Sequence, residues 1–268
     1  MTEVVIQPVL YSRSNNQLLK IMKISIIGHS HLAFVTAACM EQFHKVNVDD
    51  SKVADSELIW VCYDTPVDET GKPSPEIIVK NLESILPLAK DETIVVISSQ
   101  VPVGTCHMIQ TLYPNLDVAC SPENLRRGKA INDFMNPERI VVGCEQSAKD
   151  KIEQLFAPLG KPVFWTTVET AEMIKHAINS YLALSIAFIN EIDKICSVAG
   201  ANSKDVVYGL QSDKRIGFLS YLKPGGPYTN DTLGREIYTL IELDKKFNLG
   251  LSLFPAIKKS NDAHSNNR

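Results

Sequence analysis

Lys175 and Asn179 stand four residues apart in a stretch with helical periodicity, so both side chains lie on one face of the expected helix. A lysine in a desolvated cleft can be tuned toward neutrality and can then exchange a proton with a substrate hydroxyl. The pair is therefore a candidate for acid–base chemistry. On spacing alone, a solvated lysine beside an asparagine that bonds a loop is the commoner arrangement.

A glycine-containing turn near the start of the chain is a candidate phosphate loop. The apolar run 24–27 is followed by Gly28, Ser30 and Ala33 at the three small-residue positions of the dinucleotide fingerprint. The first glycine makes the tight turn, and alanine is accepted at the third position. Serine at the second position crowds the backbone that a diphosphate approaches, although its small size makes the loss partial. A strand-to-helix turn that merely needs a glycine explains the pattern equally well.

Polar residues around this turn extend the candidate cofactor site. His29 and His31 flank it and can meet a phosphate when protonated, although surface histidines are commoner. Asp49, followed by Asp50, comes about 20 residues after the glycine, where an acidic residue binds ribose hydroxyls in dinucleotide-binding folds. The residues predicted here to bind the cofactor are Gly28, Ser30, His31, Leu32 and Asp49.

Composition narrows the class of protein. The 268 residues carry a net charge of −4 and form no basic stripe, so a nucleic-acid partner is not expected. No apolar run approaches the ~20 residues that cross a membrane, and the N-terminus lacks the features of a signal peptide. The six cysteines form no CxxC pair, and no histidine cluster has metal-ligand spacing. We therefore expect a cytoplasmic protein with reduced thiols and no metal.

The hydrophobic pattern predicts the elements that position these residues. Short apolar runs alternate with helical stretches up to about residue 165, which is typical of a parallel α/β sheet. The expected strands cover 24–27, 58–62, 93–98, 117–119 and 140–142. From 166 onward the pattern is helical, with a long helix to about 198 and shorter ones at 203–210 and 232–247. The polar tail from 261 is expected to fray.

The long helix has its own local signals. Thr166 and Glu169 have capping-box spacing at its start. Met173, Ile174, Ile178 and Leu182 are spaced as a packing face. This helix is too apolar for a lone solvent-facing rod, so it predicts a homodimer through the stretch 169–198.

Five stretches, in order along the chain, resemble motifs of one known family, the UDP-glucose/GDP-mannose dehydrogenases. The resemblance covers residues 22 to about 264. They are TPVDETG (65–71), VPVGT (101–105), SPENLRRG (121–128), DFMNPERIVVG (133–143) and ETAEMIK (169–175).

The resemblance implies a fold and a domain plan. The fold is a Rossmann-like, mostly parallel sheet followed by an all-helical dimerisation domain. After an N-terminal extension (1–21), the NAD-binding domain covers 22–165 and the helical central domain covers 166–268. The C-terminal nucleotide-binding domain of the family is expected to be absent.

The resemblance also implies an activity and its residues. The family oxidises the C6 alcohol of a nucleotide sugar to a carboxylate in two hydride transfers to NAD. Its catalytic residues carry over to Glu123, Lys175, Asn179 and Asp231, and further cofactor contacts carry over to Thr65, Pro66 and Gln100. The Lys-x-x-x-Asn arrangement is also similar to that of the β-hydroxyacid dehydrogenases, in which lysine serves as acid and base.

Several positions depart from the family pattern. The glycine-rich loop at 223–232 contains no cysteine, whereas the family loop delivers a cysteine that forms a thiohemiacetal. Without a thiolate, no covalent intermediate can carry a second oxidation. Cys120 is a candidate substitute, although a buried structural cysteine is the default.

Two further positions differ from the family pattern. Gln100 stands where the family usually has a threonine. Arg127 stands where a glutamate is common, and this change reverses the local charge and favours an anionic ligand. Only nine residues (49–57) precede the second predicted strand, so this sheet edge is expected to be reduced or rerouted.

Three hypotheses remain open. The first is an NAD-dependent oxidoreductase that acts on a nucleotide sugar and is limited to one two-electron step. The second is a catalytically inactive relative that serves as a ligand-binding or scaffold protein. In the third, a separate chain completes the nucleotide site.

Overall fold

The computed structural model describes residues 20–69, 71–126 and 128–265, and these form two compact units. The sheet unit comprises 20–65 and 75–175, and the helical unit comprises 66–74 and 176–265. The predicted extension 1–21 lies outside the described residues except for Lys20 and Ile21.

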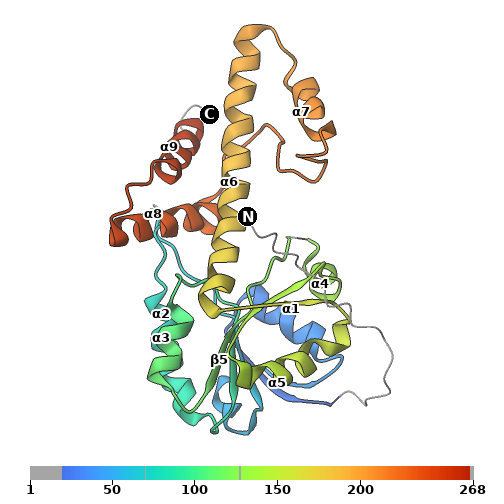
Figure 1. Cartoon of the computed structure of the whole chain (residues 1–268), viewed down its shortest axis with the longest axis vertical. Coiled ribbons are helices and arrows are strands. Elements are labelled where there is room, and N and C mark those ends of the chain that lie inside the picture. The colour runs from blue at the N-terminus through green and yellow to red at the C-terminus, as the bar shows by residue number, and fades with distance from the viewer. Residues whose placement is uncertain (1–19, 70, 127, 266–268) are drawn as a thin grey trace, which may run out of the picture. The chain divides into compact units, whose positions relative to one another are not determined.

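The sheet unit is built on a seven-stranded sheet of the described residues, in the order β2-β1-β3-β4-β5-β6-β7 (Figure 1). All neighbouring strands are parallel except β5 and β6, which pair antiparallel at Cys120 and Gly143. The predicted Rossmann-like, mostly parallel fold is therefore confirmed. The strands are β1 (Lys23–Ile27), β2 (Lys45–Asn47), β3 (Leu58–Val61), β4 (Ile94–Ile97), β5 (Asp117–Cys120), β6 (Ile140–Gly143) and β7 (Val163–Thr166).

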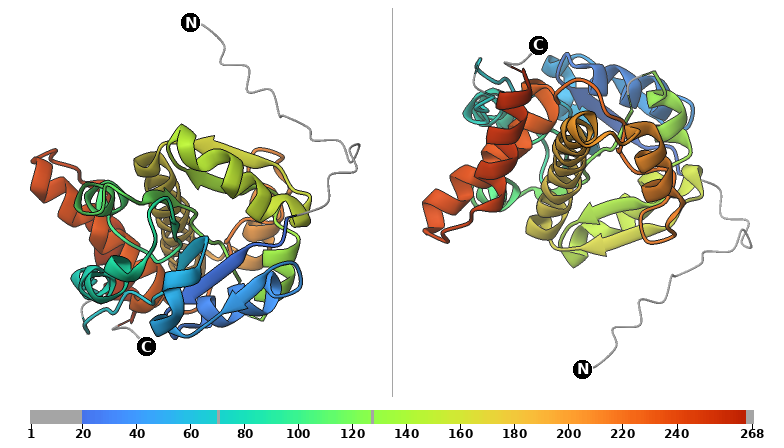
Figure 2. Two further views of the ribbon diagram at one scale, coloured as in Figure 1. Left: turned by 90° about the horizontal axis from the view of Figure 1, so that it is seen from below. Right: turned by 90° about the horizontal axis from the view of Figure 1, so that it is seen from above.

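Both faces of the central strands are covered by helices, which explains their unbroken apolar sequences. In β3, Leu58 and Trp60 pack into one core cluster, whereas Ile59 and Val61 pack into the other. The first cluster includes residues of α1 (His31–Met40), α4 (Ala130–Met135) and α5 (Gln146–Phe156); the second includes residues of α2 (Glu76–Ile85) and α3 (Thr105–Leu112). Figure 2 shows these layers from two directions. Short 3-10 helices follow α2 (η2, Leu86–Leu88) and α5 (η3, Ala157–Leu159).

The edge of the sheet at β2 is short, as the spacing predicted. The chain passes from β2 to β3 through the short segment η1 (Asp50–Asp55), whose 3-10 turns are interrupted by a kink at Lys52, and β2 is the terminal strand. Val53 of η1 is fully buried and belongs to the core cluster that also contains α2 and α3. Strand β7 was not predicted, because its residues are half-exposed at the opposite edge.

Helix α6 (Val168–Ala199) is capped at Thr167, one residue after the predicted cap Thr166. Thr167 accepts a hydrogen bond from the Thr170 amide at 3.2 Å, whereas Thr166 is the last residue of β7. The predicted packing face is wrong at Met173, which is 40% exposed, whereas Ile174 packs against the core cluster that contains α2 and α3. Apart from Ile189, the buried residues of the helix are polar or small, and they include Glu172, His176, Ser180, Ala183, Ala187 and Asn190.

The helical unit continues with α7 (Ser203–Ser212), the π-turn η4 (Asn230–Gly234), α8 (Arg235–Phe247) and α9 (Leu253–Ser265). The predicted frayed tail is wrong as far as Ser265. Asn261 is buried within α9, where its side chain hydrogen-bonds both the amide and the carbonyl of Tyr228. In the parts of the chain that the structure describes, no helix combines the length and apolarity needed to cross a membrane.

Candidate active site

Gly28 makes the turn from β1 to α1, and no other residue fits there. Its φ is +109°, and a Cβ atom would lie 2.7 Å from the carbonyl oxygen of Cys62. A side chain is therefore excluded both by backbone conformation and by contact with the end of β3. This close approach leaves the N-terminus of α1 at the carboxyl edge of the sheet, where dinucleotides bind in this class of fold.

Ser30 caps α1 and points into the protein. Its hydroxyl accepts from the Ala33 amide at 3.0 Å and donates to the Cys62 carbonyl at 2.5 Å, and the residue is 3% exposed. The side chain is thus occupied by the protein and is directed away from solvent. The amides of His31 and Leu32, at the first two positions of the helix, have no hydrogen-bond partner among the described residues and can serve an anion.

Two acids follow β2, and they differ in how their carboxylates are used. Asp49 accepts from the amide and hydroxyl of Ser51 and pairs with Lys52 at 2.9 Å, and these contacts lower its pKa to about 2. Asp50 accepts from the Tyr63 hydroxyl at 3.3 Å, and its other carboxylate oxygen is buried and finds no donor within the described chain. Asp50 therefore has acceptor capacity left for a ribose hydroxyl, a feature that the spacing could not distinguish from Asp49.

The loops that follow β3 and β4 are tied to each other. Thr65 is buried, and its hydroxyl donates to the backbone carbonyl of Gln100. Gln100 is half-buried at the start of the loop after β4. Pro66 is exposed and begins the segment 66–74, which belongs to the helical unit. The structure thus brings Thr65 and Gln100 together.

Lys175 lies beside the segment that follows β5. Its amine donates to the backbone carbonyl of Glu123 at 2.6 Å and to the side-chain oxygen of Asn124 at 3.2 Å, and the residue is half-buried. Burial raises the pKa of Glu123 to about 7, against the opposing effect of the Lys175 charge. A lysine and a carboxyl group that titrates near neutrality are therefore brought together, as acid–base chemistry requires.

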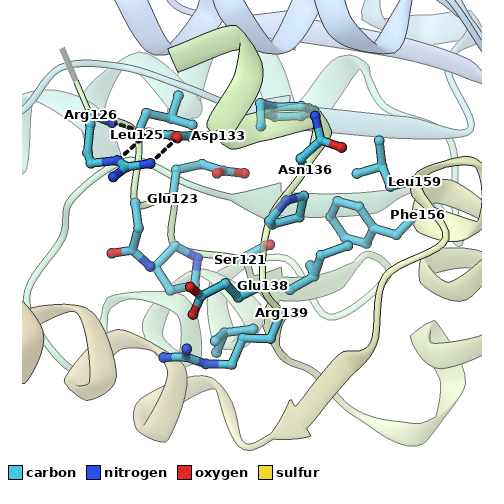
Figure 3. Close-up of a pocket in the computed structure, with 16 residues that line it drawn as sticks. Ser121, Glu123, Leu125, Arg126, Asp133, Asn136, Glu138, Arg139, Phe156 and Leu159 are labelled. Atoms are coloured by element: carbon cyan, nitrogen blue, oxygen red, sulfur yellow. Dashed lines mark hydrogen bonds and ion pairs between the residues drawn. The ribbon is translucent and has the colours of Figure 1, made fainter. Parts of the chain in front are cut away.

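A cavity of about 240 Å³ opens beside Glu123 (Figure 3). Arg126 binds Asp133 through two hydrogen bonds of 2.9 and 2.6 Å at its rim, and this pairing lowers the pKa of Asp133 to about 2. Arg139 and Glu138 also line it. The cavity thus presents charged groups of both signs next to the candidate acid.

Asn179 and Asp231 belong to the helical unit. Asn179 is half-buried one turn after Lys175 on α6, so the predicted common face of these two residues is present. Asp231 lies in the π-turn η4 and accepts from the Thr229 hydroxyl at 2.5 Å.

The glycine-rich loop 223–232 is held by side chains from two helices. Asn190 of α6 accepts from the Gly225 amide at 2.9 Å, and His264 of α9 contacts the Gly225 carbonyl at 2.7 Å. Tyr228 is 7% exposed and packs in the core of the helical unit. The loop therefore places an aromatic side chain, and no thiol, at its centre.

Comparison with known proteins decides the family. Residues 19–160 match the model of the NAD-binding domain of the UDP-glucose/GDP-mannose dehydrogenase family, and residues 169–263 match its central domain. The chain belongs to the UDP-glucose/GDP-mannose dehydrogenase family. The sheet unit thus carries the family's NAD-binding domain, as predicted from the sequence.

Individual relatives agree with this assignment. The chain is 34% identical over 218 residues to the UDP-glucose 6-dehydrogenase YwqF of Bacillus subtilis, covering 78% of this chain and 49% of the relative. It therefore spans about half the length of that family member. Among solved structures, a UDP-glucose dehydrogenase of Pyrobaculum islandicum superposes with a TM-score of 0.80 at 21% identity, over 96% of this chain and 70% of that one. An NDP-N-acetyl-D-galactosaminuronic acid dehydrogenase of Methanosarcina mazei gives 0.73 at 18%, over 90% and 66%.

The residues of this family member fit a bound dinucleotide at the Gly28 turn. The turn leaves no room for a Cβ atom, and the first two amides of α1 have no hydrogen-bond partner among the described residues. The cysteines do not form an obvious reactive site, because all six are free and buried. Cys120 is 3% exposed, and its neighbour Cys106 has a pKa raised well above its usual value by a hydrogen bond to Cys120 and by burial. Across residues 20–69, 71–126 and 128–265, no three His, Cys, Asp or Glu side chains gather as a metal site.

Proposed function

We propose that this family member is an NAD-dependent oxidoreductase that acts on a CH–OH group of a nucleotide sugar and stops after one two-electron step. The observation that carries the proposal is the Lys175 amine, held at 2.6 Å from the Glu123 carbonyl beside a carboxyl group whose pKa is raised to about 7. NAD, when bound at the Gly28 turn, supplies the hydride acceptor.

The proposed roles follow from the chemistry of each side chain. Lys175 takes the proton of the substrate hydroxyl, and the Glu123 and Asn124 oxygens orient its amine. Asn179, on the same helix face, is proposed to hold the reacting oxygen, and Asp231 is proposed to assist from the π-turn. At the cofactor, Gly28, Ser30, His31 and Leu32 form the phosphate turn. Asp49 or Asp50 is proposed to bind the ribose hydroxyls of NAD. Further proposed contacts, near the nicotinamide ring, come from Thr65, Pro66 and Gln100.

The limit of one step rests on the loop 223–232. Oxidation of an aldehyde to a carboxylate by hydride transfer needs a nucleophile that first adds to the carbonyl carbon. The loop holds Tyr228 in the core and has no cysteine. The product is therefore expected to be the aldehyde, with one NADH formed for each sugar consumed.

The test is a stoichiometric assay. The protein is incubated with NAD and a panel of UDP- and GDP-sugars, NADH is followed by absorbance, and aldehyde is trapped with a hydrazine reagent. A ratio of one NADH per trapped aldehyde, lost in Lys175→Ala but not in the exposed control Lys194→Ala, is the expected result. A ratio of two with carboxylate formed contradicts the single step, and failure of NADH to bind at millimolar concentration contradicts the oxidoreductase.

A second candidate function is a catalytically inactive, ligand-binding relative. Its specific support is the clamped loop, in which Asn190, Asn261 and His264 hold the backbone and Tyr228 fills the core. In the same assay, this alternative predicts that NADH binds and that no sugar is oxidised.

A cytoplasmic homodimer completes the proposal. Tyr181, Phe188 and Ile195 lie seven residues apart on α6 and are 65%, 45% and 58% exposed, so they form an apolar stripe suited to a second copy of the helix. The six free cysteines fit a reducing compartment.

A further inference from the structure

Glu172 is a buried acid in the second turn of α6, and the proposed reaction gives it no role. It is 3% exposed. One carboxylate oxygen accepts from the Gly104 amide at 2.6 Å, and the other accepts from the Cys106 amide at 2.9 Å. Both amides belong to the N-terminus of α3, where the helix dipole also favours a negative charge. The carboxylate is therefore compensated by a bidentate set of charge-assisted hydrogen bonds.

These bonds define one end of the loop that joins β4 to α3. The other end is held by Thr65, whose hydroxyl donates to the Gln100 carbonyl. Within the loop, the Thr105 hydroxyl donates to the Pro102 carbonyl at 2.6 Å. Gly104 adopts a φ of +95°, which turns its amide toward Glu172. The loop that carries the cofactor candidate Gln100 is thus fixed at both ends.

The Glu172 carboxylate also fixes the position of the first turns of α6, which carry Lys175. Lys175 follows Glu172 by three residues, close to one turn, and its amine reaches the segment after β5 at Glu123 and Asn124. The first turns of α6 therefore bridge two loops, the one after β4 through Glu172 and the one after β5 through Lys175. A shift of α6 at the first contact displaces the amine at the second.

We propose that Glu172 is a positioning residue that sets the Lys175 amine against the 121–124 segment by tying α6 to the N-terminus of α3. The inference rests on the proposed function only for its effect on turnover. Glu172→Gln tests it. The glutamine side chain has nearly the same size, but its NH2 group would face one of the two backbone N–H donors and could not accept a hydrogen bond from it. Glu169→Gln is the matched control, since Glu169 lies one turn earlier on α6, has a side chain that is 46% exposed, and lies 3.8 Å from His107.

The first readout does not require activity. Lysine amines are labelled by reductive 13C-methylation, and the Lys175 signal is assigned by its loss in Lys175→Arg. Glu172→Gln is expected to move this signal and leave the other lysine signals in place, whereas Glu169→Gln moves none of the lysine signals near the site. Hydrogen exchange of the 101–106 peptide should become faster by roughly tenfold or more, the factor that corresponds to loss of one charge-assisted bond. An unmoved Lys175 signal in a folded Glu172→Gln protein overturns the proposal.

The second readout separates positioning from cofactor binding. If the wild-type protein turns over, Glu172→Gln is expected to lower kcat by roughly tenfold with little change in the KM for the sugar, because the ground-state contacts remain while the base is displaced. A proportional rise in KM at constant kcat overturns the positioning role. If the wild-type protein shows no turnover, the proposed function fails, and the lysine signal alone decides the role of Glu172. Should Glu172→Gln not fold, Glu172→Asp, which keeps the charge but shortens the reach, is measured in the same way.

Discussion

The Lys175 amine lies 2.6 Å from the backbone carbonyl oxygen of Glu123, so the candidate base is bonded to the main chain of the candidate acid. A carbonyl acceptor keeps its geometry whatever the protonation state of the Glu123 side chain. The carboxyl group can therefore gain or lose a proton near pH 7 while the lysine stays in place. A pH titration can therefore change the charge of the Glu123 carboxyl group without removing the hydrogen bond that holds Lys175.

Stability should fall with rising pH because of Glu123. Its folded pKa of about 7 lies above the ordinary value of 4.5, so the folded state holds the proton more tightly. The contribution is fully present below pH 4.5 and is lost as the pH rises through 7. Urea unfolding should show that wild-type stability, relative to Glu123→Gln, drops by on the order of 2–3 kcal/mol between these limits. Glu138→Gln, on the rim of the same cavity, serves as the control; a parallel drop in Glu123→Gln itself would contradict the assignment.

Gly28→Ala should unfold or severely destabilise the sheet unit. The added Cβ meets the Cys62 carbonyl oxygen at 2.7 Å, and φ is +109°. We expect a loss of at least about 3 kcal/mol in the free energy of unfolding. Gly160→Ala separates the two causes, because Gly160 also has a positive φ but has nothing within 4 Å of its Cβ position; it should cost about 1–2 kcal/mol. Equal losses in the two variants would show that the contact is unimportant.

Ser30→Gly should reduce stability without improving cofactor affinity. The serine hydroxyl caps α1 and points into the protein, so its removal opens no space for a diphosphate. Ser30→Ala should lower the free energy of unfolding by about 1–2 kcal/mol, and Ser30→Gly by less. Titration of Ser30→Gly with NADH should give a dissociation constant within about threefold of wild type. A tenfold tighter complex would mean that serine does crowd the site.

Phe188→Asp should convert the proposed dimer into a monomer. Phe188 lies in the centre of the stripe formed with Tyr181 and Ile195, and a carboxylate there would be buried against a second copy. Analytical ultracentrifugation should show the mass of one chain for this variant and of two for wild type. Phe247→Asp, at an exposed position on α8, is the control. A wild-type protein that is monomeric at high concentration excludes the interface.

Much of the fold follows from local patterns. The runs around Leu58 and Ile94 are apolar throughout because both of their faces are covered, and such runs reveal buried parallel strands without any tertiary information. Strand β7 and helix α9 were missed for the opposite reason. Phe164 is exposed at a sheet edge, and Asn261 is buried only because it bonds Tyr228, more than thirty residues away along the chain. Polar residues on a packing face carry no local signal of burial.

The sequence by itself determined the family, the sheet class and the spacing of Lys175 and Asn179 on one helix face, because consecutive motifs and helical periodicity are local properties. The tertiary structure alone decided which partners these side chains meet. The Ser30 hydroxyl points into the protein because the end of β3 supplies the Cys62 carbonyl as its acceptor. Glu172 became a clamp because the amides of α3 converge on it. Such partners lie far apart in sequence, and only chain folding brings a donor and an acceptor within hydrogen-bond distance.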